Sequence, residues 1–154
     1  MTELTTNKED STITIIAGSC HCKNLNFTIR VMKGSELTAW DCNCSLCNMK
    51  KNVHIIVPGQ MFHASEAASV PATLYQFNTQ KAKHLFCPVC GVEAYYVPRS
   101  NTDGYAVTVA CLDPESVKAA KVRITVKQYD GINWEQAYES TGIQGMTKSP
   151  HVCS

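Results

Sequence analysis

The sequence has no apolar run of about eighteen residues, the length that a membrane-spanning helix needs. Its first residues, MTELTTNKED, contain no apolar core, so we expect no secretory signal peptide there. Lysine and arginine are scattered, and no basic run is longer than the pair Lys50–Lys51. Nucleic-acid-binding proteins typically carry a clustered basic face, so there is no strong nucleic-acid signature. These absences predict an intracellular protein, cytoplasmic and/or nuclear, that makes no membrane contact.

Signals for helices are also few. Only 113–121 and 133–140 begin with a capping residue, Asp113 or Asn133, followed by a helical pattern. Short segments that are rich in β-branched or aromatic residues and bounded by turn residues predict strands instead. These segments are 12–18, 25–31, 36–42, 53–58, 73–79, 93–98, 105–112 and 122–129. We therefore predict a mainly β protein of several short antiparallel sheets, with one or two short helices near the C-terminus.

No internal repeat and no linker divides the chain, and 154 residues suit one domain with a real core. Residues 1–11 are polar, and we expect them to be disordered. Residues 12–145 are predicted to form a single domain, and 146–154 a flexible tail. The oligomeric state is not predicted by the sequence.

Cysteine is the residue type that the sequence has in excess, with nine in all. Seven fall in three groups: CHC at 20–22, CNCSLC at 42–47 and CPVC at 87–90. Without a secretion signal, such clustering indicates metal binding rather than disulfide bonds. Cys111 is expected to be a small buried residue at the end of a strand, and Cys153 a free thiol in the tail.

Two of the groups can form one closed zinc site. Cys20 and Cys22 are two positions apart on an extended chain, so their side chains point to the same face. Cys87 and Cys90 precede Gly91, which permits the positive φ of a tight knuckle. Each pair supplies half of a tetrahedron, and the four cysteines together predict a structural zinc site.

The third group, Cys42, Cys44 and Cys47, supplies three ligands and no obvious fourth. Structural zinc sites close with four protein ligands, whereas catalytic sites keep a position open. We favour an open second zinc site, and so two Zn²⁺ per chain, at which soft thiolate ligands suit an incoming substrate thiolate. Alternatively, the three cysteines are reduced and free of metal, or a fourth ligand closes the site. The candidates for that ligand are Cys111, His84, His54 and Cys153.

Three motifs resemble the core motifs of the glutathione-dependent formaldehyde-activating enzyme family, whose fold is called Mss4-like. They are GSCHC at 18–22, CNCSLC at 42–47 and HLFCPVCG at 84–91. The likeness extends from about residue 17 to residue 148 and is strongest to the centromere protein V branch of that family. The segments that carry this branch resemblance are DCNCSLC, HIIVP, FNTQKAKHLFC, CGVEAYYVPRSN and CLDPESV.

The resemblance implies a β-rich fold around zinc knuckles, with the second zinc beside the substrate site. It also implies the reaction of glutathione with formaldehyde to S-(hydroxymethyl)glutathione, which is carbon–sulfur lyase chemistry. Three features depart from the family pattern. Lys23 stands where a glycine is usual, and Asn43 where the enzyme branch commonly has a histidine. The basic pair often found straight after the third cysteine of the second motif is NM here, with Lys50 and Lys51 two positions later.

On this hypothesis Cys42, Cys44 and Cys47 form the reacting centre, and further side chains serve the substrate, a small thiol such as glutathione. His84 is a candidate donor to the adduct oxygen. Glutathione carries two carboxylates, so nearby cations should help to bind it. The candidates for substrate binding are Lys50, Lys51, Arg99 and Asn78. Each residue also has a structural alternative: a hydrogen-bonded core histidine, solvated surface lysines, or an asparagine at a strand end.

A second hypothesis has no catalysis at all. Both metals would then only stabilise the domain, which would be a zinc-stabilised binding module of the centromere protein V type. Tyr75, Phe77, Tyr95 and Tyr96 could form a recognition patch, although their spacing along strands is more typical of core residues.

Overall fold

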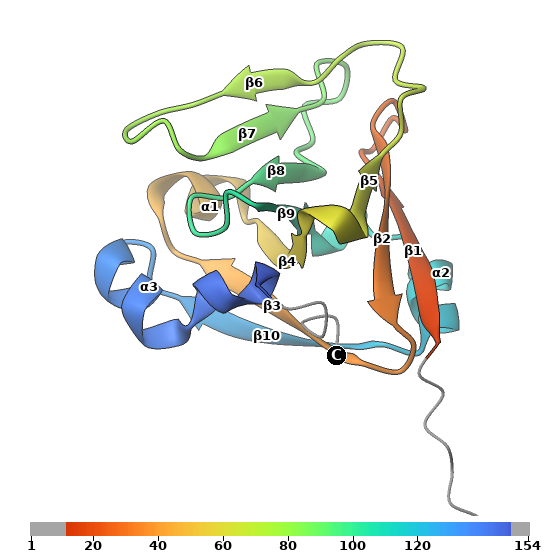
Figure 1. Cartoon of the computed structure of the whole chain (residues 1–154). Coiled ribbons are helices and arrows are strands. Elements are labelled where there is room, and N and C mark those ends of the chain that lie inside the picture. The colour runs from red at the N-terminus through yellow and green to blue at the C-terminus, as the bar shows by residue number, and fades with distance from the viewer. Residues whose placement is uncertain (1–11, 149–154) are drawn as a thin grey trace, which may run out of the picture.

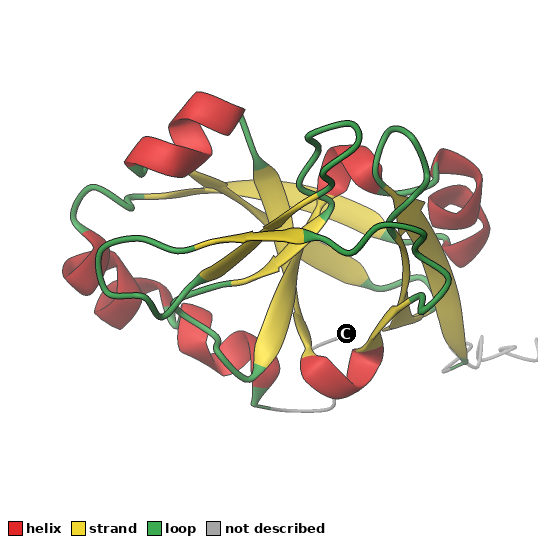
Figure 2. Cartoon of the chain, turned by 90° about the horizontal axis from the view of Figure 1, so that it is seen from above, coloured by secondary structure: helices red, strands yellow, loops and turns green. Residues whose placement is uncertain are grey.

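The computed structural model describes residues 12–148, which form two β-sheets with short helices at their edges (Figures 1 and 2). A three-stranded sheet has the order β1-β2-β5, and a seven-stranded sheet has the order β10-β3-β4-β9-β8-β7-β6. The strands are β1 (Ile13–Ser19), β2 (Asn26–Met32), β3 (Glu36–Cys42), β4 (Val53–Pro58), β5 (Phe62–Ala64), β6 (Thr73–Tyr75), β7 (Lys83–Phe86), β8 (Tyr95–Val97), β9 (Gly104–Thr108) and β10 (Arg123–Tyr129). The helices are α1 (Ser45–Lys50), α2 (Pro114–Ala120) and α3 (Trp134–Thr141), with 3₁₀ turns η1 (Gly59–Met61), η2 (Val109–Cys111) and η3 (Ile143–Thr147). The prediction of a mainly β protein is confirmed, and the architecture is consistent with an Mss4-like fold.

One strand pair departs from the expected antiparallel arrangement. β10 runs parallel to β3, with Tyr129 opposite Cys42, while the other pairings in both sheets are antiparallel. α2 connects β9 with β10 in the chain, so a crossover rather than a hairpin brings β10 to the edge of the sheet. Figure 1 shows this sheet stacked from β10 at the bottom to β6 at the top.

The central strands of the large sheet, β3, β4, β8 and β9, are largely buried on both faces, and this decides where the functional site lies. Successive residues of a strand point to opposite faces, so Ile55 joins the core between the two sheets while Ile56 joins a second cluster. Tyr95 and Tyr96 divide in the same way. The second cluster packs against α3 and η3, and it contains Cys42 and Cys47. The three-cysteine group is therefore on the face of the large sheet that is turned away from the smaller sheet.

Two helices near the C-terminus were predicted, and α2 and α3 confirm them. α2 begins as expected, with the Asp113 side chain accepting from the Ser116 backbone N–H at 3.1 Å and Pro114 in the first turn. α1 was not predicted. β5 and β7 were also missed, because each is only three or four residues long.

Three predicted strands were too long, and the segment 93–98 is a strand only from Tyr95 to Val97. The segment 73–79 is extended only through Tyr75, and the segment 105–112 ends at Thr108 and continues as η2. Cys111 therefore lies in a 3₁₀ turn and is half-buried. Residues 146 and 147, expected in the tail, belong to η3, whereas 1–11 and 149–154 lie outside the described residues. Within residues 12–148 no helix has the length and apolarity to cross a membrane.

Candidate active site

The four-cysteine cluster joins the end of β1 to the end of β7. Cys20 and Cys22 follow β1, and Cys87 and Cys90 follow β7. Their four Sγ atoms lie within 4.8 Å of one another; Cys20 and Cys22 are 3.7 Å apart, and Cys22 and Cys87 are 3.5 Å apart. A tetrahedral zinc with Zn–S distances of about 2.3 Å places its sulfurs about 3.8 Å apart. The donor set and the spacing therefore fit zinc.

Backbone geometry holds these cysteines in place. Gly91 has φ 77°, as the knuckle prediction required, and its N–H donates to the Cys87 carbonyl at 2.8 Å. The Leu25 N–H donates to Cys20 Sγ at 3.2 Å. Lys23 has φ 64°. A non-glycine residue in this left-handed region costs about 1–2 kcal/mol.

The three-cysteine cluster forms where β3 ends and α1 begins. Cys42 is the last residue of β3, Cys44 caps the N-terminus of α1, and Cys47 lies in its first turn. The Cys47 N–H donates to Cys44 Sγ at 3.4 Å, and the Cys44 N–H donates to Cys42 Sγ at 3.5 Å. The three sulfurs lie within 4.8 Å of one another, and this donor set also fits zinc.

The cluster has three members among residues 12–148. None of the fourth-ligand candidates in that part of the chain, Cys111, His84 or His54, brings a donor atom within the same distance. Cys153 lies outside the described residues. A cation at this cluster would thus keep one coordination position free of the described side chains.

The ionisation of the three thiols explains why they would favour a cation. Hydrogen bonds from Cys42 and Cys47 lower the pKa of Cys44 to about 2. The hydrogen bond to Cys44 raises the pKa of Cys42 to about 11, and hydrogen bonds to Cys42 and Cys44 raise the pKa of Cys47. Three thiolates this close repel one another, so without a cation only one is expected to be charged at neutral pH.

A loop after β10 closes over the three-cysteine cluster. A Cβ atom at Gly131 would lie 2.5 Å from Cys42 Sγ and 2.7 Å from Cys44 Cβ, so only glycine fits there. Asn43 fastens this loop, because its side chain donates to Asp130 at 3.1 Å and accepts from the Ile132 N–H at 3.1 Å. Asn43 thus holds the wall of the site.

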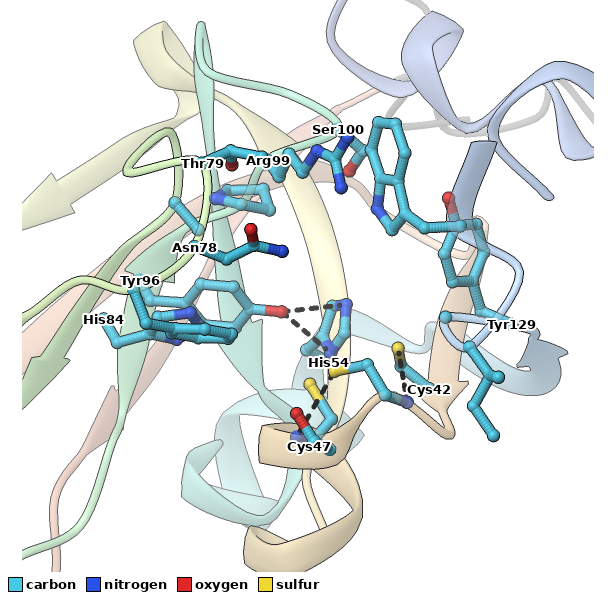
Figure 3. A pocket seen from close by; sticks show the side chains of 18 of the residues that line it. Cys42, Cys47, His54, Asn78, Thr79, His84, Tyr96, Arg99, Ser100 and Tyr129 are labelled. Atoms are coloured by element: carbon cyan, nitrogen blue, oxygen red, sulfur yellow. Dashed lines mark hydrogen bonds between the residues drawn. The ribbon is translucent and has the colours of Figure 1, made fainter. Parts of the chain in front are cut away.

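The cluster opens into a cavity of about 380 Å³. Figure 3 shows Cys42, Cys47 and His54 on one side of it, and Asn78, Thr79 and Arg99 on the other. Much of the remaining wall is aromatic or apolar, from Phe77, Tyr96, Tyr129, Ile132 and Trp134. The cavity is thus bounded by β3, α1, the β6–β7 loop and the residues that follow β8 and β10.

Three of the predicted site residues line this cavity with the cluster: His84, Asn78 and Arg99. Asn78 has φ 51° in the β6–β7 loop. The Arg99 guanidinium lies 3.6 Å from the centre of the Trp134 ring and donates to Glu135 at 3.2 Å. Since the Glu135 side chain is 78% exposed, this ion pair leaves Arg99 free to meet a second anion.

The two predicted lysines lie elsewhere. Lys50 lines a separate cavity and pairs with the buried Glu93 at 2.5 Å. Lys51 ends α1 in the left-handed conformation, and its Nζ is 3.5 Å from Asn48 Oδ1. Neither side chain lines the cavity beside the three cysteines.

The aromatic prediction was half right. Tyr95 and Tyr96 are buried, as expected of core residues, but Tyr75 and Phe77 are exposed by 47% and 37% and stack on each other. Sequence reasoning also gave no role to Tyr129, Gly131 or Trp134, which wall the site from beyond β10. The sequence YDG directly after a predicted strand indicates a turn at this position. It does not indicate which other part of the chain the turn contacts.

His54 provides a pH-dependent contribution to stability. Burial, and then the charge of Lys50, lower the pKa of His54 to about 4, so the folded protein keeps it neutral. The unfolded chain protonates it below about pH 6.5, and between that pH and pH 4 the folded state loses about 3 kcal/mol. His54→Gln is expected to lose less unfolding free energy than wild type between pH 7 and pH 5, by about 2 kcal/mol. Urea denaturation at both pH values measures this difference, and equal losses in the two proteins would contradict it.

Comparison with known proteins agrees with the cysteine motifs. The family described as Glutathione-dependent formaldehyde-activating enzyme matches residues 15–128. A crystal structure of a Rhodobacter sphaeroides protein, a structural genomics target, is 30% identical in sequence with a TM-score of 0.54. That match covers 71% of this chain and 99% of the other. The family match ends one residue before Tyr129, so the wall from Tyr129 to Trp134 lies outside it. With most of its length matched and both cysteine clusters assembled, the chain belongs to the glutathione-dependent formaldehyde-activating enzyme family.

Proposed function

We propose that the protein is a carbon–sulfur lyase that forms or cleaves the S-hydroxymethyl adduct of formaldehyde with a small thiol of the glutathione type. The observation that carries the proposal is the three-cysteine cluster, which faces a cavity and has no fourth ligand among residues 12–148. The four-cysteine cluster would hold the other zinc ion, in a structural role. Family membership supports the substrate pair, because the family is named for glutathione and formaldehyde.

A zinc ion held by Cys42, Cys44 and Cys47 would supply a soft Lewis acid with a free position that suits a further sulfur ligand. The rest of the site is formed by the chain itself. Arg99 offers a guanidinium to a substrate carboxylate, and Asn78 offers an amide on the same side of the cavity. Both lie across the cavity from Cys42 and Cys47, so a thiol directed at the cluster can keep its polar end on them.

Water is limited around the reacting atoms by the aromatic wall. Trp134 lies beneath the Arg99 guanidinium, and Phe77 stacks on His84 with ring centres 5.7 Å apart. These rings add apolar surface to the cavity wall without adding charge. A site of low polarity strengthens the ion pair between Arg99 and a substrate carboxylate.

The test is to bind thiol to protein in which cobalt replaces zinc. We expect two cobalt ions per chain and a change in the thiolate-to-cobalt charge-transfer bands on adding glutathione. S-methylglutathione, which lacks the free thiol, is the matched control and should leave the bands unchanged. With two ions bound, no response to glutathione would contradict the open site.

Catalysis needs a separate measurement, because formaldehyde and thiols also combine without a catalyst. Exchange NMR with ¹³C-formaldehyde and glutathione should show faster interconversion of free and S-hydroxymethyl carbon in the presence of the protein. Thiol binding without acceleration would contradict the enzyme and would favour the non-catalytic binding module, including that of the centromere protein V type.

A further inference from the structure

A buried carboxylate, that of Glu93, lies between two cavities of the described residues. Glu93 Oε2 is 2.5 Å from Lys50 Nζ, and Glu93 Oε1 is 3.3 Å from His84 Nδ1. The side chains of Glu93 and His84 are exposed by only 3% and 5%, and that of Lys50 by 17%. Lys50 lines one cavity, and His84 lines the cavity beside the three cysteines. Glu93 thus bridges a cation on one side and the candidate active site on the other.

Neighbouring elements fix the position of this carboxylate. The Thr108 hydroxyl donates to the Glu93 carbonyl at 2.6 Å, which ties the segment before β8 to the end of β9. Lys50 is on α1, the helix that also carries Cys47, and its Nζ lies 5.4 Å from the ring centres of Phe86 and Tyr96. The carboxylate therefore meets both of its partners from a rigid part of the fold.

The ring of His84 is equally constrained. It stacks between Tyr96 and Phe77, with ring centres 4.9 Å and 5.7 Å away and interplanar angles of 23° and 25°. Its Nδ1 meets Glu93, whereas its Nε2 makes no hydrogen bond within residues 12–148. A carboxylate can only accept, so it requires the proton on Nδ1 and leaves Nε2 with a free lone pair.

We propose that Glu93 and Lys50 are positioning residues that hold His84 in the Nδ1–H tautomer, so that Nε2 is the atom that exchanges protons with substrate. The inference rests on the proposed function, since it assigns Nε2 a task in adduct formation. Lys50 balances the charge of Glu93 and binds its second oxygen, so that Oε1 stays directed at His84.

His84 carries one proton from the thiol to the adduct oxygen. Nε2 takes the proton from the substrate thiol, and the thiolate sulfur forms a bond to the formaldehyde carbon. The electron pair of the C=O π bond moves to oxygen, and Nε2 returns the proton to that oxygen. The product is RS–CH₂–OH, and His84 ends in its starting tautomer; the reverse sequence cleaves the adduct.

Glu93→Gln tests the arrangement without changing its shape. The Lys50 ammonium can only donate, so it binds the amide oxygen and turns the amide NH₂ towards His84. Nδ1 then becomes the acceptor, and the ring proton moves to Nε2, where it blocks the lone pair. We expect kcat for adduct formation to fall by about 100-fold or more, with KM changed less than about threefold. Glu139→Gln, a matched change of an exposed glutamate on α3, should leave kcat unchanged.

Long-range ¹H–¹⁵N NMR of the histidine rings at pH 8 gives a readout that does not depend on activity. Wild type should show His84 protonated at Nδ1, and Glu93→Gln should show it protonated at Nε2. Wild-type His84 protonated at Nε2 would overturn the proposal, even if the variant did not fold. A folded Glu93→Gln variant that formed the adduct at the wild-type rate would also overturn the proposal.

The two proposals fail in different ways. If the protein does not use thiol and formaldehyde, wild type shows no acceleration, although the tautomer still switches between wild type and Glu93→Gln. If Glu93 does not position His84, wild type is active while the tautomer stays the same in both proteins.

Discussion

Cys87→Ser is expected to leave the domain unfolded under conditions in which the wild type is folded. Cys87 is 1% exposed and belongs to the four-cysteine cluster that joins β1 to β7. Structural zinc sites contribute about 10–16 kcal/mol of apparent binding free energy, whereas a domain has only about 5–15 kcal/mol of net stability. Losing one thiolate also leaves three crowded thiols, of which Cys20 is buried. The cost therefore approaches or exceeds the whole stability of the fold.

Circular dichroism and metal analysis measure this effect. The variant should lack a cooperative thermal transition and should not retain metal at the four-cysteine cluster. Cys111→Ser is the matched control, because Cys111 is half-buried but belongs to neither cluster. It should keep both the transition and the metal content of wild type. A Cys87→Ser protein with the wild-type melting temperature would contradict the structural role of the cluster.

Cys44→Ser should have the opposite outcome: a folded protein without activity. Serine is among the best N-cap residues, so its hydroxyl can replace Cys44 Sγ as the acceptor of the Cys47 N–H. The start of α1 is thereby preserved, and the four-cysteine cluster is untouched. Metal content should fall from two ions to one, and adduct formation by more than about 100-fold, since a ligand matters more than the outer partners whose loss costs about 10–100-fold.

Two measurements on this variant separate fold from function. Its thermal transition should stay cooperative, because the N-cap of α1 and the four-cysteine cluster are kept, although loss of the bound ion lowers the melting temperature. In the cobalt-loaded protein, glutathione should no longer change the charge-transfer bands. If Cys44→Ser turned over at the wild-type rate, the three cysteines would not be the reacting centre.

Much of the site could be predicted from local sequence, because its candidate metal ligands are cysteines that lie close together in the chain. The spacing of Cys20 with Cys22, and of Cys87 with Cys90, is enough to define two halves of a tetrahedron. Strand segments such as 36–42 and 53–58 were predicted at their observed bounds, since their β-branched residues and turn boundaries are local signals. The division of the seven cysteines into four and three is likewise what the clusters show.

Long-range pairing accounts for most of what was missed. Tyr129 reaches Cys42 only through the parallel β10–β3 register, and Gly131 lies against Cys42 only because that register places it there. Lys50 was expected near the substrate as a cation that could bind a glutathione carboxylate. Helix α1 instead directs the Lys50 side chain to Glu93, and Glu93 in turn contacts His84. No local pattern in the sequence predicts these contacts between residues that are far apart in the chain.

The parallel pairing of β10 with β3 also has a consequence for how the protein is made. Both cysteine clusters lie before β8 in the chain, whereas β10, Gly131 and α3 are synthesised after them. A nascent chain leaves the ribosome from its N-terminus, so the ligands emerge before the segment that closes over Cys42. The newborn chain can therefore take up metal while that side of the three-cysteine cluster is still open to solvent. When β10 and Gly131 have been synthesised and have packed against β3, they cover that side of the cluster.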